Sequence, residues 1–511
     1  MNAAEKKRKN RFKMRMIKVG VISGILILVV GLGVLGWSII SKNFSGSTQN
    51  DINTDIVIVD MSDPNGNTDY GKIYYSSIDE NHIVEEDSIR YIDNEVLVVA
   101  QDGVTREQVL QLANDYNAEI VGEIEITGDY QLRINNSSTK NELEDTVQRM
   151  QNEDIIETAS LNYVVEMSDS KQTEDCDGFY YGKQWQGNLQ NFNDAKGKSW
   201  GLEAIETTGA WDKLTYTSRQ INPVKVGVVD NGFDVNHEDL GFAELFYDNG
   251  SNGLYAPTNA HGTHVCGTIA AKNNDTIGIC GIYPYGDGRL YGVSHGGNTK
   301  YGGVNSYSEN GNFWSSVMSM KIAYSELIVR NVKVINQSQG FNYYTFDYFK
   351  KKTFFGETVD YNALKNFWDD PNNFTSDIEV AKIFGDFLNR MLQKGYDFVI
   401  VSAAGNDSDV SIGHLDCRYA SWNNLIRRED YPDVYDRIIV VGSVNNKMQI
   451  SSFSNGGDRV DIYAPGENIY STWPNNKPDS AKLKTPQRVS KKSESSHYIF
   501  REQGGVYERE Q

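Results

Sequence analysis

The stretch His261-Gly-Thr-His-Val-Cys-Gly267 begins with an imidazole and continues with small side chains, which suits a helix packed closely on a sheet. Upstream, the apolar run Val226-Gly-Val-Val229 ends at Asp230, which places a carboxylate where a buried strand passes into a loop. In parallel α/β sheets, functional side chains gather at the carboxyl ends of the strands. The two stretches, 31 residues apart, therefore predict a carboxylate at the end of a strand and an imidazole at the start of a helix.

The surrounding sequence alternates between strand-like and helical runs, which predicts a parallel sheet with helices on both faces. The strand-like runs are residues 224–229, 332–336, 398–402 and 438–442, and the helical runs follow His261 and cover 315–329 and 379–394. Ser402-Ala-Ala-Gly-Asn406 comes at the end of one such strand. Its amide can donate a hydrogen bond to a developing oxyanion, although Gly-Asn also forms turns. A lone histidine or a strand-ending aspartate is more often structural, so these motifs gain weight only in combination.

In this combination the chain resembles the subtilisin-like serine proteases. The aspartate motif is Val226-Gly-Val-Val-Asp-Asn-Gly232, the histidine motif begins at His261, and the oxyanion motif is Ala403-Ala-Gly-Asn406. Further matches are Val334-Ile-Asn-Gln-Ser338-Gln-Gly340, Ser451-Ser-Phe-Ser-Asn455 and Tyr463-Ala-Pro-Gly466. The resemblance implies a subtilisin-like three-layer fold and a serine-type endopeptidase that needs no cofactor.

The resemblance also implies residue roles. Asp230 would orient the imidazole of His261, which would act as general base, and Asn406 would hold the oxyanion. Ser338, Gln339 and Gly340 would bind the substrate peptide as an added strand. His264 is expected to pack in the interior.

The family's nucleophile motif, Gly-Thr-Ser-Met-Ala-x-Pro, does not occur in these 511 residues. Residues 475–511 form a polar tail with eight Lys or Arg and five Asp or Glu, in contrast to the acidic domain before it. We therefore expect this polypeptide to be inactive. A frameshift or fusion late in the gene and an evolved loss both explain the change. The alternative function is a non-catalytic surface protein that binds peptides.

Upstream of the peptidase domain, residues 95–166 have the pattern strand, helix, strand, strand, helix, strand. Thr105 followed by Gln108 predicts a capping box at the first helix. The order suggests a ferredoxin-like α+β module. It is similar to the family's propeptide, which implies an intramolecular inhibitor as partner.

The first residues carry eight Lys or Arg against Glu5 alone, and residues 19–40 are free of charge. A helix of that length spans about 33 Å, enough to cross a bilayer. The positive-inside rule then predicts a single-pass membrane protein with a cytoplasmic N-terminus and an extracellular body. Secretion after cleavage of a signal peptide is the alternative. The net charge of −20 makes nucleic acid an unfavourable partner.

Asp239 and Asn274 resemble parts of the family's calcium site, since hard oxygen ligands suit calcium; a solvated acidic turn is the alternative. Four cysteines allow three pairings, which sequence cannot separate. The expected organisation is a basic head at 1–18, a transmembrane helix at 19–40, a polar stalk at 41–89, a propeptide module at 90–167, a linker at 168–198, an incomplete peptidase domain at 199–474 and the tail at 475–511.

Overall fold

The computed structural model describes residues 56–66, 68–86, 89–135, 139–168, 200–216, 222–230, 232–235, 237–247, 261–272, 279–294, 312–341, 350–353, 356–467, 469–472 and 490–492. The predicted transmembrane segment 19–40 and linker 168–198 lie outside these ranges, except for Ser168. In the part of the chain that is described, no helix has both the length and the apolar character needed to cross a membrane.

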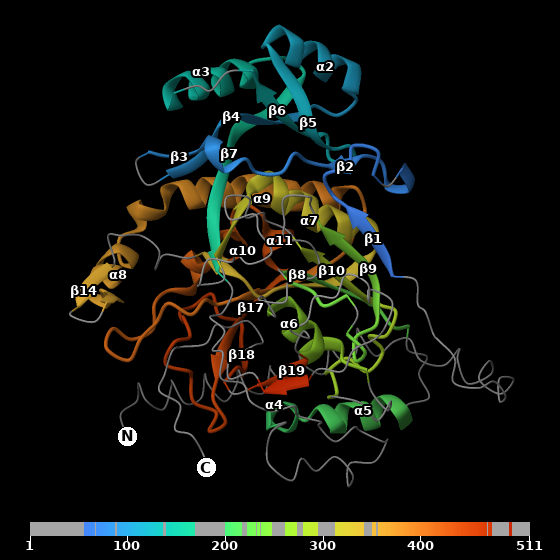
Figure 1. Cartoon of the computed structure of the whole chain (residues 1–511), viewed down its shortest axis with the longest axis vertical. Helices are drawn as coiled ribbons and strands as arrows, with labels where there is room; N and C mark the ends of the chain where they lie inside the picture. The colour runs from blue at the N-terminus through green and yellow to red at the C-terminus, as the bar shows by residue number, and fades with distance from the viewer. Residues whose placement is uncertain are drawn as a thin grey trace, which may run out of the picture.

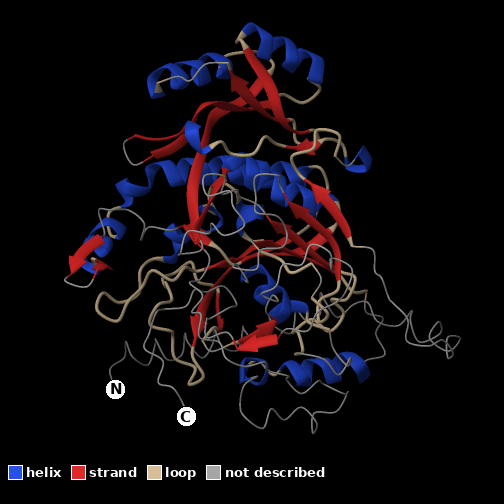
Figure 2. Ribbon diagram, viewed as in Figure 1, coloured by secondary structure: helices blue, strands red, loops and turns tan. Residues whose placement is uncertain are grey.

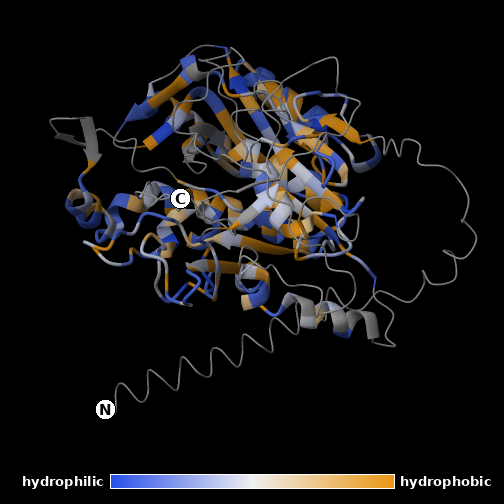
Figure 3. Cartoon of the chain, turned by 60° about the horizontal axis from the view of Figure 1, so that its bottom comes forward, coloured by the Kyte–Doolittle hydropathy of each residue, from blue (hydrophilic) through white to orange (hydrophobic). Residues whose placement is uncertain are grey.

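The larger part of the molecule is built on a parallel sheet of eight strands, in the order β1-β9-β10-β8-β12-β16-β17-β18. Its strands are β1 (Val57–Asp60), β8 (Lys225–Asp230), β9 (Phe242–Tyr247), β10 (Leu290–Ser294), β12 (Val332–Gln337), β16 (Val399–Ala403), β17 (Ile438–Val444) and β18 (Ile462–Pro465). The hydropathy colouring of Figure 3 shows apolar residues gathered in the interior of the molecule, with hydrophilic residues frequent at its periphery. The predicted α/β fold with a parallel sheet is confirmed.

Helices cover both faces of this sheet (Figure 1). On one face lie α7 (Val317–Val329) and α9 (Thr375–Gln393), and on the other lies α6 (His261–Ala270). Other described helices of this larger part are α4 (Trp200–Ala204), α5 (Thr207–Tyr216), α8 (Tyr361–Trp368), α10 (Trp422–Leu425) and α11 (Pro432–Tyr435), with 3-10 turns at Pro371–Phe374 and Cys417–Ala420. Close packing of helix on sheet depends on Gly227, because a Cβ there would lie 2.7 Å from Cδ1 of Leu327 in α7.

A second sheet lies above α7 and α9, as the red strands at the top of Figure 2 show. Its path is β11-β7-β4-β6-β5-β2, with β3 paired to β4 and β13 paired to β7. Of these, β11 is Asn312–Ser316 and β13 is Gly340–Phe341. The elements of this N-terminal module are β2 (Ile73–Tyr74), β3 (Ile83–Glu86), β4 (Ile89–Ala100), α2 (Arg106–Asp115), β5 (Ala118–Ile124), β6 (Asp129–Ile134), α3 (Lys140–Gln151) and β7 (Ile156–Ser168). The predicted capping box is present, because Thr105 accepts from the amide of Gln108 and the Gln108 side chain accepts from the amide of Thr105.

Helix α7 is buried along its whole length because it lies between the two sheets. Leu97 and Ile124 of the N-terminal module belong to the same apolar cluster as Tyr324 and Leu327 of α7. The two parts therefore share one hydrophobic core. Burial of this apolar surface is the main force that holds them together.

Residues 56–86 fall in the segment expected to be a polar stalk, yet they contain β1, β2 and β3 and enter both sheets. The polar composition misled the prediction, because these three strands are only four, two and four residues long and leave no clear pattern in the sequence. In the expected tail, Ser490–Lys492 form β20, which pairs with β19 (Tyr470–Thr472). A hairpin of β14 (Lys350–Thr353) and β15 (Gly356–Val359) completes the strands.

Candidate active site

Asp230 is the last residue of β8 and its side chain is fully buried. The strand lies between β10 and β12, so its apolar residues pack in the interior while its carboxyl end reaches the edge of the sheet. Ser294, the last residue of β10, is opposite Asp230 in the ladder. The carboxylate is thus held by a rigid strand.

His261 is the first residue of α6, and its ring contacts the Asp230 carboxylate. Nδ1 lies 2.8 Å from Oδ1 and 3.0 Å from Oδ2 of Asp230. Only 1% of the His261 side chain is exposed. An anionic partner at Nδ1 fixes the proton on that nitrogen, so Nε2 is the nitrogen that can accept a proton. The structure therefore brings together the carboxylate and the imidazole that the two motifs supply.

Thr263 joins the loop after β8 to the first turn of α6. Its amide donates to the carbonyl of Gly232 at 3.0 Å, and its hydroxyl accepts from the amide of Asp234 at 2.8 Å. Gly232 has a φ of 76°, a conformation that glycine adopts without strain. These contacts hold the strand end and the helix start in register, so the small residues of the two motifs serve the Asp230–His261 contact.

An extended segment lies against the predicted peptide-binding strand. The end of β7 runs antiparallel between β11 (Asn312–Ser316) and β13 (Gly340–Phe341). Ser168 is opposite both Asn312 and Gly340, and Met167 is opposite Phe341. The end of β7 is therefore held by main-chain pairing on both sides.

The family model for subtilases matches residues 222–498, more than half of the chain. The chain belongs to the subtilase family. Subtilisin E of Bacillus subtilis is 31% identical over 253 residues, which are 49% of this chain and 49% of that protein. The minor extracellular protease Epr of the same species is 28% identical over 278 residues, 54% of this chain and 32% of Epr. This subtilase thus spans about half of subtilisin E and about a third of Epr.

Among solved structures, this subtilase is similar to fervidolysin from Fervidobacterium pennivorans, a keratinolytic enzyme related to subtilisin. The similarity covers 82% of this subtilase and 55% of the fervidolysin chain. The sequence identity is 18% and the TM-score is 0.46.

The predicted oxyanion residue Asn406 follows β16 in this subtilase, two strands from β8 and at the same edge of the sheet. Gly405 has a φ of 94°. Asn455 holds this loop, because its Oδ1 accepts from the amide of Asp407 at 2.9 Å and its own amide donates to the Gly405 carbonyl at 2.9 Å. The second half of the Ser451–Asn455 motif thus supports the oxyanion loop.

Ser338 and Gln339 follow β12 at the same edge, and both are buried. The Asn336 side chain donates to the Ser338 hydroxyl at 2.7 Å. The sequence predicted this strand but not β11, which lies on the other side of the end of β7. The reason is that residues 315–329 were predicted to form one helix. Helix α7 begins only at Val317, with Ser316 as its cap. A serine pair before the apolar run was the available signal.

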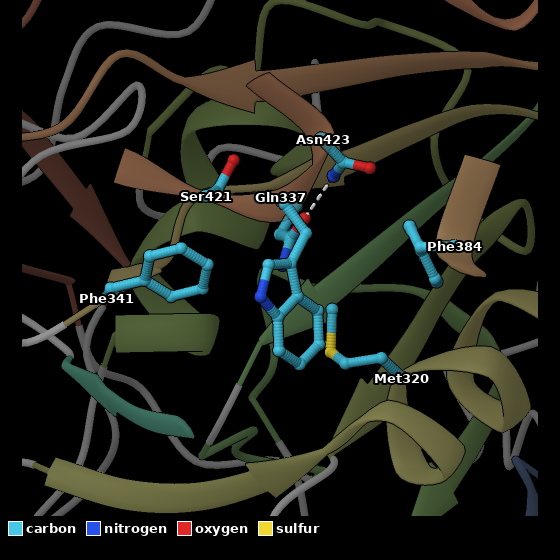
Figure 4. A pocket seen from close by; sticks show the side chains of 7 residues that line it. Met320, Gln337, Phe341, Phe384, Ser421 and Asn423 are labelled. Atoms are coloured by element: carbon cyan, nitrogen blue, oxygen red, sulfur yellow. Dashed lines mark hydrogen bonds between the residues drawn. The ribbon is translucent and has the colours of Figure 1, made fainter. Parts of the chain in front are cut away.

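A small pocket lies beside Phe341 of β13 (Figure 4). It is lined by Met320, Gln337, Phe341, Phe384, Ser421, Trp422 and Asn423. The amide of Asn423 donates to Gln337, and the Tyr324 hydroxyl donates to Gln337 at 2.8 Å. Because Phe341 also pairs with β7, the pocket adjoins the bound segment.

Two further expectations concern His264 and the calcium site. His264 is fully buried, and burial lowers its pKa well below the usual value, so the ring stays neutral and packs as expected. Asp239 is buried, with Oδ2 accepting from the amide of Ile279 at 2.9 Å, whereas Asn274 lies outside the described residues. Among the residues that are described, no group of three or more His, Cys, Asp or Glu could hold a metal ion.

Proposed function

We propose that this chain derives from a membrane-anchored, outward-facing serine endopeptidase precursor that hydrolyses peptide bonds through an acyl-enzyme. The buried contact between His261 and Asp230 carries the proposal, because a carboxylate on Nδ1 prepares Nε2 to take a proton from a nucleophile. Peptide or protein is the substrate class, since β11 and β13 pair with an extended chain.

In this mechanism Asp230 orients the ring and stabilises its charged form, while Asn406 donates to the oxyanion. Ser338 to Gly340 align the substrate backbone as an added strand. Calcium bound near Asp239 would be structural. No cofactor takes part in the reaction.

We further propose that the N-terminal module is a ferredoxin-like inhibitory propeptide. Three features support this role: the neighbour order β7-β4-β6-β5, helices α2 and α3 on one face, and the end of β7 in the peptide position. A chain that occupies the peptide position excludes substrate. The anchor at residues 19–40 would keep the whole precursor at the membrane.

The polypeptide of 511 residues contains no Gly-Thr-Ser motif, so we expect it to lack a nucleophile for His261. A fluorophosphonate probe, which reacts only with an activated serine, should leave it unlabelled, with subtilisin E as the labelled control. Spontaneous shortening or labelling that disappears in His261→Ala would contradict the proposed inactivity.

The roles of Asp230 and His261 need a separate test, because an inactive chain reports no catalysis. A chimera in which residues after Pro474 are replaced by the corresponding nucleophile segment of subtilisin E should react with the probe. The same chimera with His261→Ala should not. A folded chimera that stays unlabelled would overturn the assignment of this pair.

A non-catalytic surface protein that binds peptides remains the second candidate, favoured by the strand pairing of β7 with β11 and β13. If that is the function, extended peptides should compete with the end of β7 in the unmodified chain. Two results together would favour this candidate. A fluorescent peptide should bind in a way that depends on the β13 backbone, and the fluorophosphonate probe should not label the chimera.

A further inference from the structure

Strand β1 comes from upstream of the N-terminal module but belongs to the central sheet of the peptidase domain. Val57 to Asp60 pair in parallel with Glu244 to Tyr247 of β9. In Figure 1 this blue strand lies beside the green strand β9 at the edge of the sheet. The sheet therefore takes its outermost strand from a segment 187 residues earlier in the chain, as the register of Val59 with Phe246 shows.

Apolar packing holds this strand in place. Met61 is fully buried and its amide donates to the carbonyl of Tyr247 at 2.6 Å. The amide of Tyr75 donates back to the Met61 carbonyl at 3.2 Å, and Tyr75 is 1% exposed. Both side chains belong to the same core cluster as Val229 and Phe246. This segment is thus part of the peptidase core.

A second contact joins the segment to the end of α7. The Arg330 guanidinium lies 4.8 Å from the ring centre of Tyr70 and 4.5 Å from that of Phe246. Its Nε lies 2.5 Å from a Glu244 carboxylate oxygen, and Glu326 accepts from its Nη1. A cation between two aromatic faces and paired with carboxylates fixes the position of Tyr70.

The other end of the segment lies in the N-terminal module. Ile73 and Tyr74 of β2 pair antiparallel with Ile124 and Glu123 of β5. The amide of Lys72 donates to the Glu125 carboxylate at 2.9 Å. Residues 56–75, named here the strap, therefore connect the edges of both sheets.

We propose that the strap keeps the N-terminal module on the peptidase domain after the connection at residues 169–199 is cut. Such a cut yields two pieces, of which the first carries the strap and the module and the second carries β8 to β18. Main-chain pairing at β9 and the burial of Met61 then act between the pieces. If residues 1–55 attach the first piece to a membrane, the second piece would stay there through its contacts with the first.

The test uses the full chain with a site for a sequence-specific endoprotease, in a Gly-Ser spacer, inserted between residues 169 and 199. After cutting, the two pieces should elute together in gel filtration, and their dissociation rate is measured with the second piece immobilised. Ile58→Pro with Val59→Pro removes consecutive amides, one of which faces β9 in a parallel ladder. Loss of this hydrogen bond to β9, with two proline rings placed in the strand, should raise the dissociation rate about tenfold or more.

The matched control is Val57→Thr with Ile58→Thr, which keeps the amides and β-branched side chains at positions 53% and 50% exposed. Its dissociation rate should match that of the parent chain. Tyr70→Ala is a milder variant that removes only the ring over Arg330, and it should speed dissociation about threefold or more. The proposal is overturned if the parent pieces separate on cutting, or if the proline and Tyr70→Ala variants dissociate at the parent rate.

Discussion

Lys321 of α7 and Asp129 of β6 form an ion pair between the peptidase domain and the N-terminal module. Nζ lies 2.6 Å from Oδ1, and the two side chains are 2% and 3% exposed. The ammonium also lies 5.9 Å from the ring centre of Phe387. A charge buried at this depth is stable only while its partner stays in place.

Removing one member of this pair should be costly. We expect Lys321→Met to lower the free energy of unfolding by about 3–5 kcal/mol, because it leaves the Asp129 carboxylate buried without its cation. The double variant Lys321→Met with Asp129→Leu should recover most of that loss. Urea denaturation of the four chains measures the coupling, and equal losses in single and double variants would contradict it.

Gly267 in α6 is close to β19. A Cβ at this position would lie 2.2 Å from Oγ1 of Thr472 and 2.5 Å from Oγ of Ser471. These hydroxyls donate to the carbonyls of Thr263 and His264, both at 2.6 Å. Gly267→Ala should therefore lower the free energy of unfolding by about 1–3 kcal/mol through overpacking.

The control for Gly267→Ala is Gly209→Ala in α5, where a Cβ meets no atom within 4 Å. Better helix propensity should leave that variant unchanged or more stable by up to about 1 kcal/mol. Thermal melting of both proteins checks the difference, and a destabilised Gly209→Ala or a neutral Gly267→Ala would refute the packing argument.

Glu326 should make stability depend on pH. Burial raises the pKa of this carboxyl to about 7, against the opposing effect of Arg330. The folded state then binds a proton more tightly than the unfolded state, whose carboxyl has a pKa of 4.5. The stabilisation is therefore complete below pH 4.5 and is lost as the pH rises to about 7.

Glu326→Gln should remove this part of the pH dependence. Between pH 5 and pH 8, the free energy of unfolding of the variant should fall by about 2 kcal/mol less than that of the parent chain. Chemical denaturation at pH 5 and pH 8 measures the effect. The exposed substitution Glu119→Gln serves as the control and should follow the parent chain. A parallel pH profile for Glu326→Gln and the parent would contradict this assignment.

The capping box at α2 should contribute measurably. Thr105→Ala removes the acceptor for the amide of Gln108 and should cost about 1 kcal/mol, whereas Thr105→Ser keeps a hydroxyl and should cost less. Hydrogen exchange of the α2 amides locates the loss. Equal protection in the alanine and serine variants would argue against a role for the cap.

The sequence alone determined the features that depend on local pattern. The apolar runs before Asp230 and after Val332 predict buried parallel strands, and Thr105 with Gln108 predicts a helix start. The family motifs also identified Asp230, His261 and Asn406. Each of these residues lies within two positions of a glycine, and such short motifs can be found in the sequence without a structure.

Only the tertiary structure decided how distant segments pair. The segment Val57–Asp60 is too short, and its neighbours are too polar, to indicate a strand of the peptidase sheet. Likewise, the sequence around Lys321 does not indicate that Asp129 is its partner. Register between remote strands and burial of a lone charge depend on which surfaces meet after folding, and a local sequence window carries no information on that meeting.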